Sequence, residues 1–166
     1  MYPDRDNIEI IRCYTESDWS QVREIYDLSK PDEIGDLVDS ASIIPLAQDE
    51  QMYRYFIESS IWVYEMEQNI SGFIGLKGNV ISWLFVHPDY RRQGIARKLL
   101  IKLIEEHNVS LKLNLVKNNS AAMSLYLNLG FKVFEEFEGN MYGQKIPAVR
   151  MKLNKSTEPA LKRDGA

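Results

Sequence analysis

The sequence has little of what disulfides, metal sites and membrane spans require. Its single cysteine, Cys13, cannot form an intrachain disulfide. Because the chain has only two histidines, His87 and His107, we also expect no metal site. No apolar run approaches the roughly 20 residues that a membrane helix needs. The opening residues, MYPDRDNIEI, are too acidic for a secretory signal peptide. We therefore expect a cytoplasmic protein without membrane contact.

The chain also has no excess of basic residues. Its 166 residues carry a net charge of −4, which argues against nonspecific nucleic-acid binding. The charges are unevenly distributed, because residues 31–70 hold nine acids against Arg54 alone, whereas residues 91–98 hold four bases and no acid. Two regions of opposite charge are compatible with two differently charged ligands, or with two solvated faces.

The spacing of apolar residues changes along the chain from extended to helical and back. Lys30-Pro31 should close the first helix, because the residue before a proline avoids helical backbone. Gly130 should end the last helix. The predicted strands are 8–14, 61–66, 72–76, 80–86, 111–116, 131–137 and 149–153, and the predicted helices are 15–29, 46–59, 93–107 and 120–129, with 32–42 ambiguous.

This order of elements predicts an α/β (α+β) fold. The short links between the second, third and fourth strands favour antiparallel neighbours, whereas the later strand–helix–strand unit is a crossover. We expect a mixed, mostly antiparallel central sheet of about six to seven strands, flanked by about four helices. No repeat or linker is visible, so we expect a single domain over residues 1–153 and a flexible tail at 154–166.

The segment 84–96 is typical of an anion-binding loop. A strand ends, a turn follows, and a helix begins near Gln93 with the small residues Gly94 and Ala96 in its first turn. A ligand can approach the free backbone N–H groups there, and the positive helix end favours phosphate, as do Arg91, Arg92 and the following Arg97. The segment matches neither the G-x-x-x-x-G-K-[ST] pattern nor G-x-G-x-x-G, so the common nucleotide-binding folds lose support.

Two short segments carry recognisable patterns. Residues 91–96 read RRQGIA, which fits R/Q-x-x-G-x-G/A, and residues 119–131 read NSAAMSLYLNLGF, which fits N-x-x-A-x-x-x-Y-x-x-x-G-F. Leu84, Val86 and Pro88 precede the first pattern, and a long amphipathic helix follows it. Together these features resemble the GNAT superfamily of N-acetyltransferases, and the resemblance covers about residues 8–153.

The resemblance implies an enzyme that transfers an acetyl group from acetyl-CoA to a primary amine, without a metal. The pyrophosphate of acetyl-CoA would lie on the backbone amides of 91–96, and the pantetheine arm would pair with the backbone near Leu84 and Val86. The residues implied to contact acetyl-CoA are Leu84, Phe85, Val86, Arg91, Arg92, Gln93, Gly94, Ile95, Ala96, Arg97, Asn119 and Tyr126.

Two catalytic groups follow from the same resemblance. The backbone amide of Val86 would donate to the oxyanion, and Tyr126 would protonate the departing thiolate, because a phenol stays protonated at neutral pH. The residues alone leave alternatives open. Tyr126 lies at the edge of an apolar helix face and can simply pack in the core, and Asn119 can be the N-cap of its helix, alone or in addition.

The general base stays unassigned. Several members of the family carry an acid just before the L-x-V of the fourth strand, where this chain has Ser82 and Trp83. Glu65 or an ordered water chain can serve instead. Histidine as a residue type is suited to proton transfer near neutral pH, but His87 stands before a proline, at a position that varies in the family.

The acceptor amine of the family enters over the first two helices, which here include the acidic residues 31–70. Acidic and aromatic walls favour a cationic amine: a polyamine, an aminoglycoside-like molecule, or a lysine or N-terminus of a peptide. We expect direct attack in a ternary complex. The alternatives are an acyl-CoA-binding regulatory module with little catalysis and, less favoured, a nucleic-acid-binding domain. The protein is expected to be a monomer or a homodimer.

Overall fold

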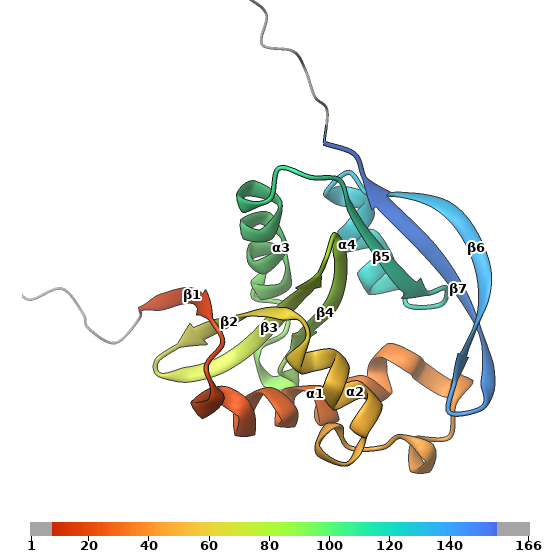
Figure 1. The fold of residues 1–166 in the computed structure, drawn as a ribbon, viewed down its shortest axis with the longest axis horizontal. Coiled ribbons are helices and arrows are strands. Elements are labelled where there is room, and N and C mark those ends of the chain that lie inside the picture. Colours follow the sequence, from red (N-terminus) through yellow and green to blue (C-terminus); the bar gives the residue numbers. More distant parts are fainter. Residues whose placement is uncertain (1–7, 156–166) are drawn as a thin grey trace, which may run out of the picture.

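Seven strands form one sheet in the computed structural model, which describes residues 8–155. They are β1 (Glu9–Cys13), β2 (Ser60–Met66), β3 (Asn69–Lys77), β4 (Val80–Val86), β5 (Leu111–Val116), β6 (Lys132–Met141) and β7 (Gln144–Leu153). Their order in the sheet is β1-β2-β3-β4-β5-β7-β6 (Figure 1), and all neighbours are antiparallel except β4 and β5. The predicted mixed, mostly antiparallel sheet is confirmed.

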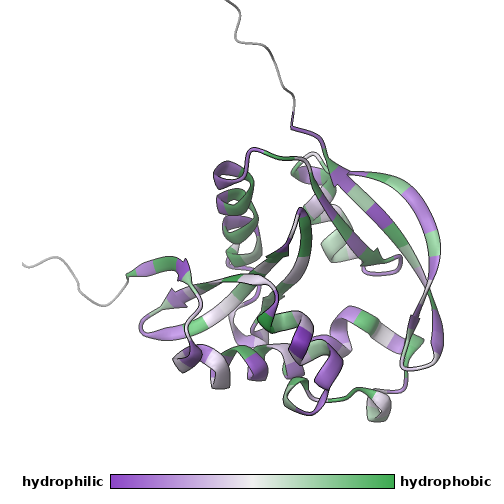
Figure 2. Cartoon of the chain, in the orientation of Figure 1, coloured by the Kyte–Doolittle hydropathy of each residue, from purple (hydrophilic) through white to green (hydrophobic). Residues whose placement is uncertain are grey.

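Four α-helices cover the two faces of this sheet: α1 (Trp19–Ile34), α2 (Glu50–Ile57), α3 (Ile95–Glu106) and α4 (Ser120–Asn128). Side chains alternate between the faces of a strand, so Val63 of β2 packs with α1 and α2 while Tyr64 packs with α3 and α4. Figure 2 shows the hydrophobic residues gathered on the central strands and on the sheet-facing side of α3. Helices therefore lie on both sides of the strands that form the site.

The first helix continues through Pro31 to Ile34, so the prediction that Lys30-Pro31 closes it is wrong. A proline inside a helix removes one backbone donor. Beyond it, however, the Ile34 side chain is fully buried against Val38, Val116 and Ile146, and this burial offsets the lost hydrogen bond. The chain leaves the helix at Gly35, whose φ of +63° is in the left-handed region.

The helix predicted over 46–59 is divided in two. A short 3-10 turn, Leu46–Gln48, is followed by Asp49 in extended conformation, and α2 begins at Glu50. The Asp49 carboxylate accepts a hydrogen bond from the Met52 N–H at 3.0 Å, so it caps the new helix. An aspartate whose side chain accepts a hydrogen bond from the first N–H groups of a helix favours the start of a new helix after it, so the predicted single helix is interrupted at Asp49.

Strands β3, β6 and β7 are longer than predicted. The β6–β7 ladder runs from Lys132↔Lys152 to Met141↔Gln144, and Tyr142 and Gly143 close it with φ angles of +50° and +80°. Two left-handed residues in succession are typical of a tight hairpin turn. Backbone pairing around this turn therefore outweighs the poor strand propensity of Gly139 and Pro147.

Two expectations about the chain's extent stay predictions. Residues 1–7 and 156–166 lie outside the described residues, so the structure does not test the single domain over 1–153 or the tail at 154–166. Within residues 8–155, none of the helices has the length and apolar character needed to cross a membrane.

Candidate active site

The parallel strands β4 and β5 touch at one end and then separate. Their ladder has one residue pair, Val80↔Lys112, where the Lys112 N–H donates to the Asn79 carbonyl at 2.9 Å. Farther along, the two strands diverge (Figure 1). Residues 81–85 of β4, with Asn114 and Leu115 of β5, line a cavity of about 100 Å³ between them, which we call the inner cavity. One backbone edge of β4 is thus turned toward open space.

The backbone of Val86 belongs to that open edge. On the other edge, the His87 N–H donates to the Ser71 carbonyl at 2.8 Å, and Phe85 lies opposite Phe73 of β3. Alternate residues of an antiparallel strand turn their N–H and C=O groups to opposite edges, so Val86 turns both away from β3. Its carbonyl accepts a hydrogen bond from Ser29 Oγ of α1 at 3.0 Å. The Val86 N–H faces the same side.

After β4 the chain forms a loop rich in free N–H groups. Arg92 and Gly94 have φ angles of +61° and +75°, and the first helical bond of α3 runs from the Lys98 N–H to the Gly94 carbonyl at 3.0 Å. Left-handed residues in such a loop turn successive N–H groups to one side, and the first N–H groups of a helix have no partner within it. The arginine side chains add positive charge. This arrangement suits a phosphate.

A groove of about 540 Å³ brings the predicted cofactor residues together, and we call it the loop groove. All of them line it except Gln93, which is exposed. Its size, its free N–H groups and its arginines fit the pyrophosphate and pantetheine of acetyl-CoA. The sequence did not indicate its other lining residues: Ser29, Asp32, Glu33, Tyr90, Ala121, Ala122 and Leu125.

Tyr126 lies between the loop groove and the inner cavity and lines both. Its ring packs edge-on against Phe131, with 5.5 Å between ring centroids, so the core-packing alternative holds for the ring. Burial, and secondarily the negative charge of Glu33, raise the pKa of the Tyr126 phenol above its ordinary value. The hydroxyl therefore stays protonated over the whole neutral range.

Asn119 is the N-cap of its helix, and its contact with acetyl-CoA stays a prediction. Its side-chain oxygen accepts a hydrogen bond from the Ala122 N–H at 3.3 Å, so it caps α4. It also lines both the loop groove and the inner cavity. Capping and ligand contact are thus compatible at this residue.

The two side chains considered as general bases lie elsewhere. Glu65 accepts a hydrogen bond from Arg12 Nε at 2.6 Å and lines neither cavity that contains Tyr126. His87 accepts from the Asp89 N–H at 3.1 Å and lines a separate cavity of about 230 Å³. The structure does not bring either side chain to Tyr126.

Helix α1 supplies three site residues that sequence reasoning missed. Tyr26, Lys30 and Glu33 line the inner cavity, and Lys30 Nζ lies 3.0 Å from Glu33 Oε2. The Lys30 ammonium also lies over the rings of Tyr26 and Phe85, at 5.6 and 5.9 Å from their centroids. Their spacing of four and three residues places all three on one helix face, a signal that the predicted end at Lys30 concealed.

The Tyr26 hydroxyl is buried and makes no hydrogen bond within residues 8–155. Burial raises the pKa of this phenol well above its ordinary value, and the nearby phenol of Tyr142 adds to the effect. Burial likewise raises the pKa values of Tyr14, Tyr64 and Tyr126. A buried donor without a partner lowers stability, typically by about 1–3 kcal/mol.

We expect Tyr26→Phe to raise the melting temperature at pH 7 by about 2–4 °C, the shift that about 1 kcal/mol produces in a domain of this size. A phenol with a raised folded-state pKa stabilises the fold below about pH 10, and this contribution is lost as the pH rises further. The melting temperature measured from pH 7 to 11 should therefore fall less steeply with pH in the variant than in the wild type. Tyr53→Phe, at an exposed ring, is the matched control. A lower melting temperature in Tyr26→Phe than in the wild type would show that the Tyr26 hydroxyl makes a stabilising hydrogen bond.

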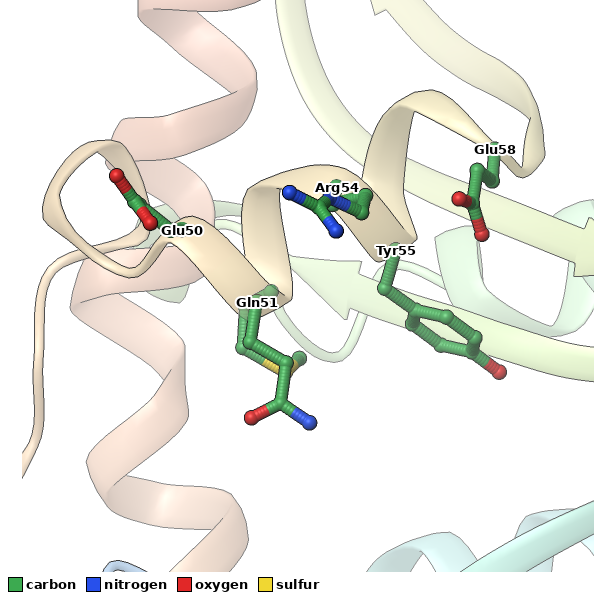
Figure 3. Close-up of a pocket in the computed structure, with 6 residues that line it drawn as sticks. Glu50, Gln51, Arg54, Tyr55 and Glu58 are labelled. Atoms are coloured by element: carbon green, nitrogen blue, oxygen red, sulfur yellow. The ribbon is translucent and has the colours of Figure 1, made fainter.

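Another cavity, of about 580 Å³, lies along α2 and is called the outer cavity. Figure 3 shows Glu50 and Glu58 at the two ends of this helix, with Gln51 and Tyr55 pointing to one side of it. Met52 lines both the outer and the inner cavity, so the two adjoin at this side chain. A molecule that reaches Tyr126 from the side of α2 would pass this region.

A family profile described as an acetyltransferase (GNAT) domain matches residues 33–155, which is more than half of the chain. The chain belongs to the GNAT family of acetyltransferases. The peptidyl-lysine N-acetyltransferase YjaB of Salmonella typhimurium is 32% identical over 111 residues, covering 63% of this chain and 73% of YjaB. The L-amino acid N-acyltransferase MnaT of Escherichia coli is 32% identical over 95 residues, covering 52% of this chain and 55% of MnaT.

The structure of YncA from Salmonella typhimurium, which contains its cofactor acetyl-CoA, superposes on this GNAT chain with a TM-score of 0.69. The two are 20% identical, and the match covers 92% of this chain and 97% of YncA, a likeness that shows the fold. The protein is therefore an N-acetyltransferase that uses acetyl-CoA. Within residues 8–155 of this GNAT protein, no three His, Cys, Asp or Glu side chains gather as metal ligands would.

Proposed function

We propose that this enzyme transfers the acetyl group of acetyl-CoA to the primary amine of a cationic small molecule or peptide, by direct attack in a ternary complex. The observation that carries the proposal is the meeting of the loop groove and the inner cavity. They share Tyr126, Leu84 and Phe85, so a thioester in one and an amine in the other would meet at these side chains. Two substrates held together need no covalent enzyme intermediate.

The proposed chemistry uses the groups on both sides of that junction. The neutral amine nitrogen forms a bond to the acetyl carbon, and the bond from that carbon to sulfur breaks. The Val86 N–H, on the open edge of β4, donates to the oxygen as negative charge develops there. Tyr126 gives its proton to the sulfur and recovers one from the new amide nitrogen, so the protons balance.

The charge of the outer cavity supports a cationic acceptor, because its two acids, Glu50 and Glu58, outnumber its one base, Arg54. Four acids of the 31–70 region line cavities: Asp32 and Glu33 the loop groove, Glu50 and Glu58 the outer cavity. Others serve the fold instead, since Glu65 pairs with Arg12 and Asp49 caps α2. The printed names of YjaB and MnaT indicate a peptide lysine and an L-amino acid as acceptors, both of which present an amine.

Release of free thiol from acetyl-CoA with a panel of amines tests this proposal. We expect turnover with polyamines or lysine-containing peptides, and a KM for the polycation that rises with ionic strength, because exposed attraction is screened within about 8 Å at physiological salt. The KM for acetyl-CoA should change less. A neutral or anionic best acceptor would contradict the cationic assignment, and no release with any amine would favour the regulatory-module alternative.

Glu50→Lys should raise the KM for a polycationic acceptor by about two- to fivefold, the effect of one exposed charge pair, while leaving the KM for acetyl-CoA unchanged. Glu50 lines the outer cavity and, unlike Asp49, caps no helix, so charge reversal there leaves the start of α2 intact. Glu105→Lys, an exposed position on α3, is the matched control. Equal KM values in the two variants would remove the outer cavity from the acceptor's path.

A further inference from the structure

The Lys30–Glu33 ion pair lies inside the inner cavity, where an amine and a thioester would meet. Its side chains are 9% and 29% exposed, and Glu33 lines the loop groove as well. We propose that Glu33 is the carboxylate that binds the acceptor's ammonium group and takes its proton, and that Lys30 occupies this position in the free enzyme. The inference rests on the proposed function and assigns the general base that the sequence left open.

Glu33 is held close to the groups of the proposed chemistry. Ser29, one helical turn earlier on the same face of α1, donates to the Val86 carbonyl at 3.0 Å and so fixes this part of the helix against β4. Glu33 and Tyr126 both line the inner cavity and the loop groove, so the carboxylate and the phenol border the same space. Glu65 and His87 have no such position.

Lys30 presents to Glu33 the same group that the acceptor would present. A primary ammonium at 3.0 Å from a carboxylate is the geometry of a bound amine substrate. When an acceptor displaces the Lys30 ammonium from Glu33, the ammonium keeps its contacts with the rings of Tyr26 and Phe85. These cation–π contacts stabilise its charge after displacement. The unpartnered Tyr26 hydroxyl in the same cavity is a further polar contact for an entering amine.

Two ammonium groups beside one carboxylate also favour deprotonation of the acceptor. A like charge nearby disfavours the charged form, so Lys30 lowers the pKa of the bound amine. The amine proton moves to a Glu33 carboxylate oxygen and from there to solvent, and the nitrogen lone pair becomes free to attack. The other titratable groups near this cavity are Tyr26 and Tyr126, which line it, and Tyr142 and Asp49, whose charges act on Tyr26. The Asp32–Arg91 pair lines the adjoining loop groove.

The test compares Glu33→Gln and Lys30→Met, using the best amine of the panel. Loss of one hydrogen bond to a charged group predicts that Glu33→Gln raises the amine KM about 10- to 100-fold. It should also lower kcat about 100-fold or more, as loss of a general base does. Lys30→Met frees the carboxylate, so the amine KM should fall about two- to fivefold. In Lys30→Met, the increase of kcat with pH should occur at higher pH than in the wild type, because Lys30 no longer lowers the pKa of the bound amine.

Asp36→Asn, an exposed acid three residues after Glu33, is the matched control and should change neither constant. Methionine keeps most of the length and the apolar character of the Lys30 side chain but removes the ammonium, and melting curves verify the fold of each variant. An unchanged amine KM in Glu33→Gln, or a raised one in Lys30→Met, overturns the proposal, and the second result would make Lys30 an anchor for an acceptor carboxylate.

Calorimetric binding of n-butylammonium in the presence of CoA separates this inference from the proposed function. Weaker binding to Glu33→Gln than to the wild type supports the Glu33 site even if no amine of the panel is acetylated. Equal binding overturns it even if the wild type acetylates several amines. If Lys30→Met does not fold, this comparison and the kinetics of Glu33→Gln decide the question.

Discussion

Gly94→Glu should weaken acetyl-CoA binding by about 100-fold or more. The residue lies at the N-terminus of α3 in the loop groove, with no other atom within 4 Å of a Cβ placed on it, so a side chain would extend freely into the phosphate position. A carboxylate there adds like-charge repulsion of several kcal/mol to the steric block. Acetyl-CoA raises the wild-type melting temperature by mass action, and this shift should disappear.

Backbone strain must be separated from ligand repulsion in this experiment. Any non-glycine residue at the φ of +75° of Gly94 costs about 1 kcal/mol or more. Gly78 offers a matched control, because it has a φ of +62°, equally open space, and a position in the β3–β4 turn. Gly78→Glu should lose similar stability and keep full affinity for acetyl-CoA. Wild-type affinity in folded Gly94→Glu would refute the anion-loop assignment.

The loop groove was predictable because its signals are local. Val80–Val86 and Leu111–Val116 are short apolar runs with unambiguous ends, and their predicted bounds match the structure. The small residues Gly94 and Ala96 indicate a helix N-terminus that a ligand can reach, within a few residues of the end of the strand. These elements position the predicted residues without help from distant parts of the chain.

The part of the site proposed to bind the acceptor, the inner cavity and the end of α1, was not predictable from the sequence. Contacts between residues far apart in the chain determine its structure. The helix continues past Pro31 since Ile34 packs against Val116 and Ile146, residues more than 80 positions away, and no local pattern encodes that contact. The early end assigned at Lys30 separated Glu33 from the face that carries Tyr26 and Lys30. In the same way, the single-pair contact of β4 and β5 creates the inner cavity, and strand propensities do not specify where a parallel pair separates.

Tyr126→Phe should lower kcat by about 10- to 10⁴-fold while leaving acetyl-CoA affinity and the melting temperature nearly unchanged. The ring keeps its edge-on contact with Phe131, so only the hydroxyl at the junction of the two cavities is lost. Without it the departing thiolate has no proton donor at that position. Because burial holds the phenol's pKa above its usual range, wild-type kcat should continue to rise with pH through 9, as the acceptor amine loses its proton.

Steady-state kinetics with the best acceptor, beside Tyr53→Phe as an exposed-phenol control, decides the role of this residue. A general acid that acts only in the transition state predicts equal losses in kcat and kcat/KM, whereas a substrate contact would raise KM alone. The leaving group of the acetyl donor gives a second readout, since an acetyl thioester whose thiol has a lower pKa should lose less rate in the variant. An unchanged kcat would mean that Tyr126 contributes packing only, and that the thiolate leaves unprotonated or draws its proton from Glu33 or water.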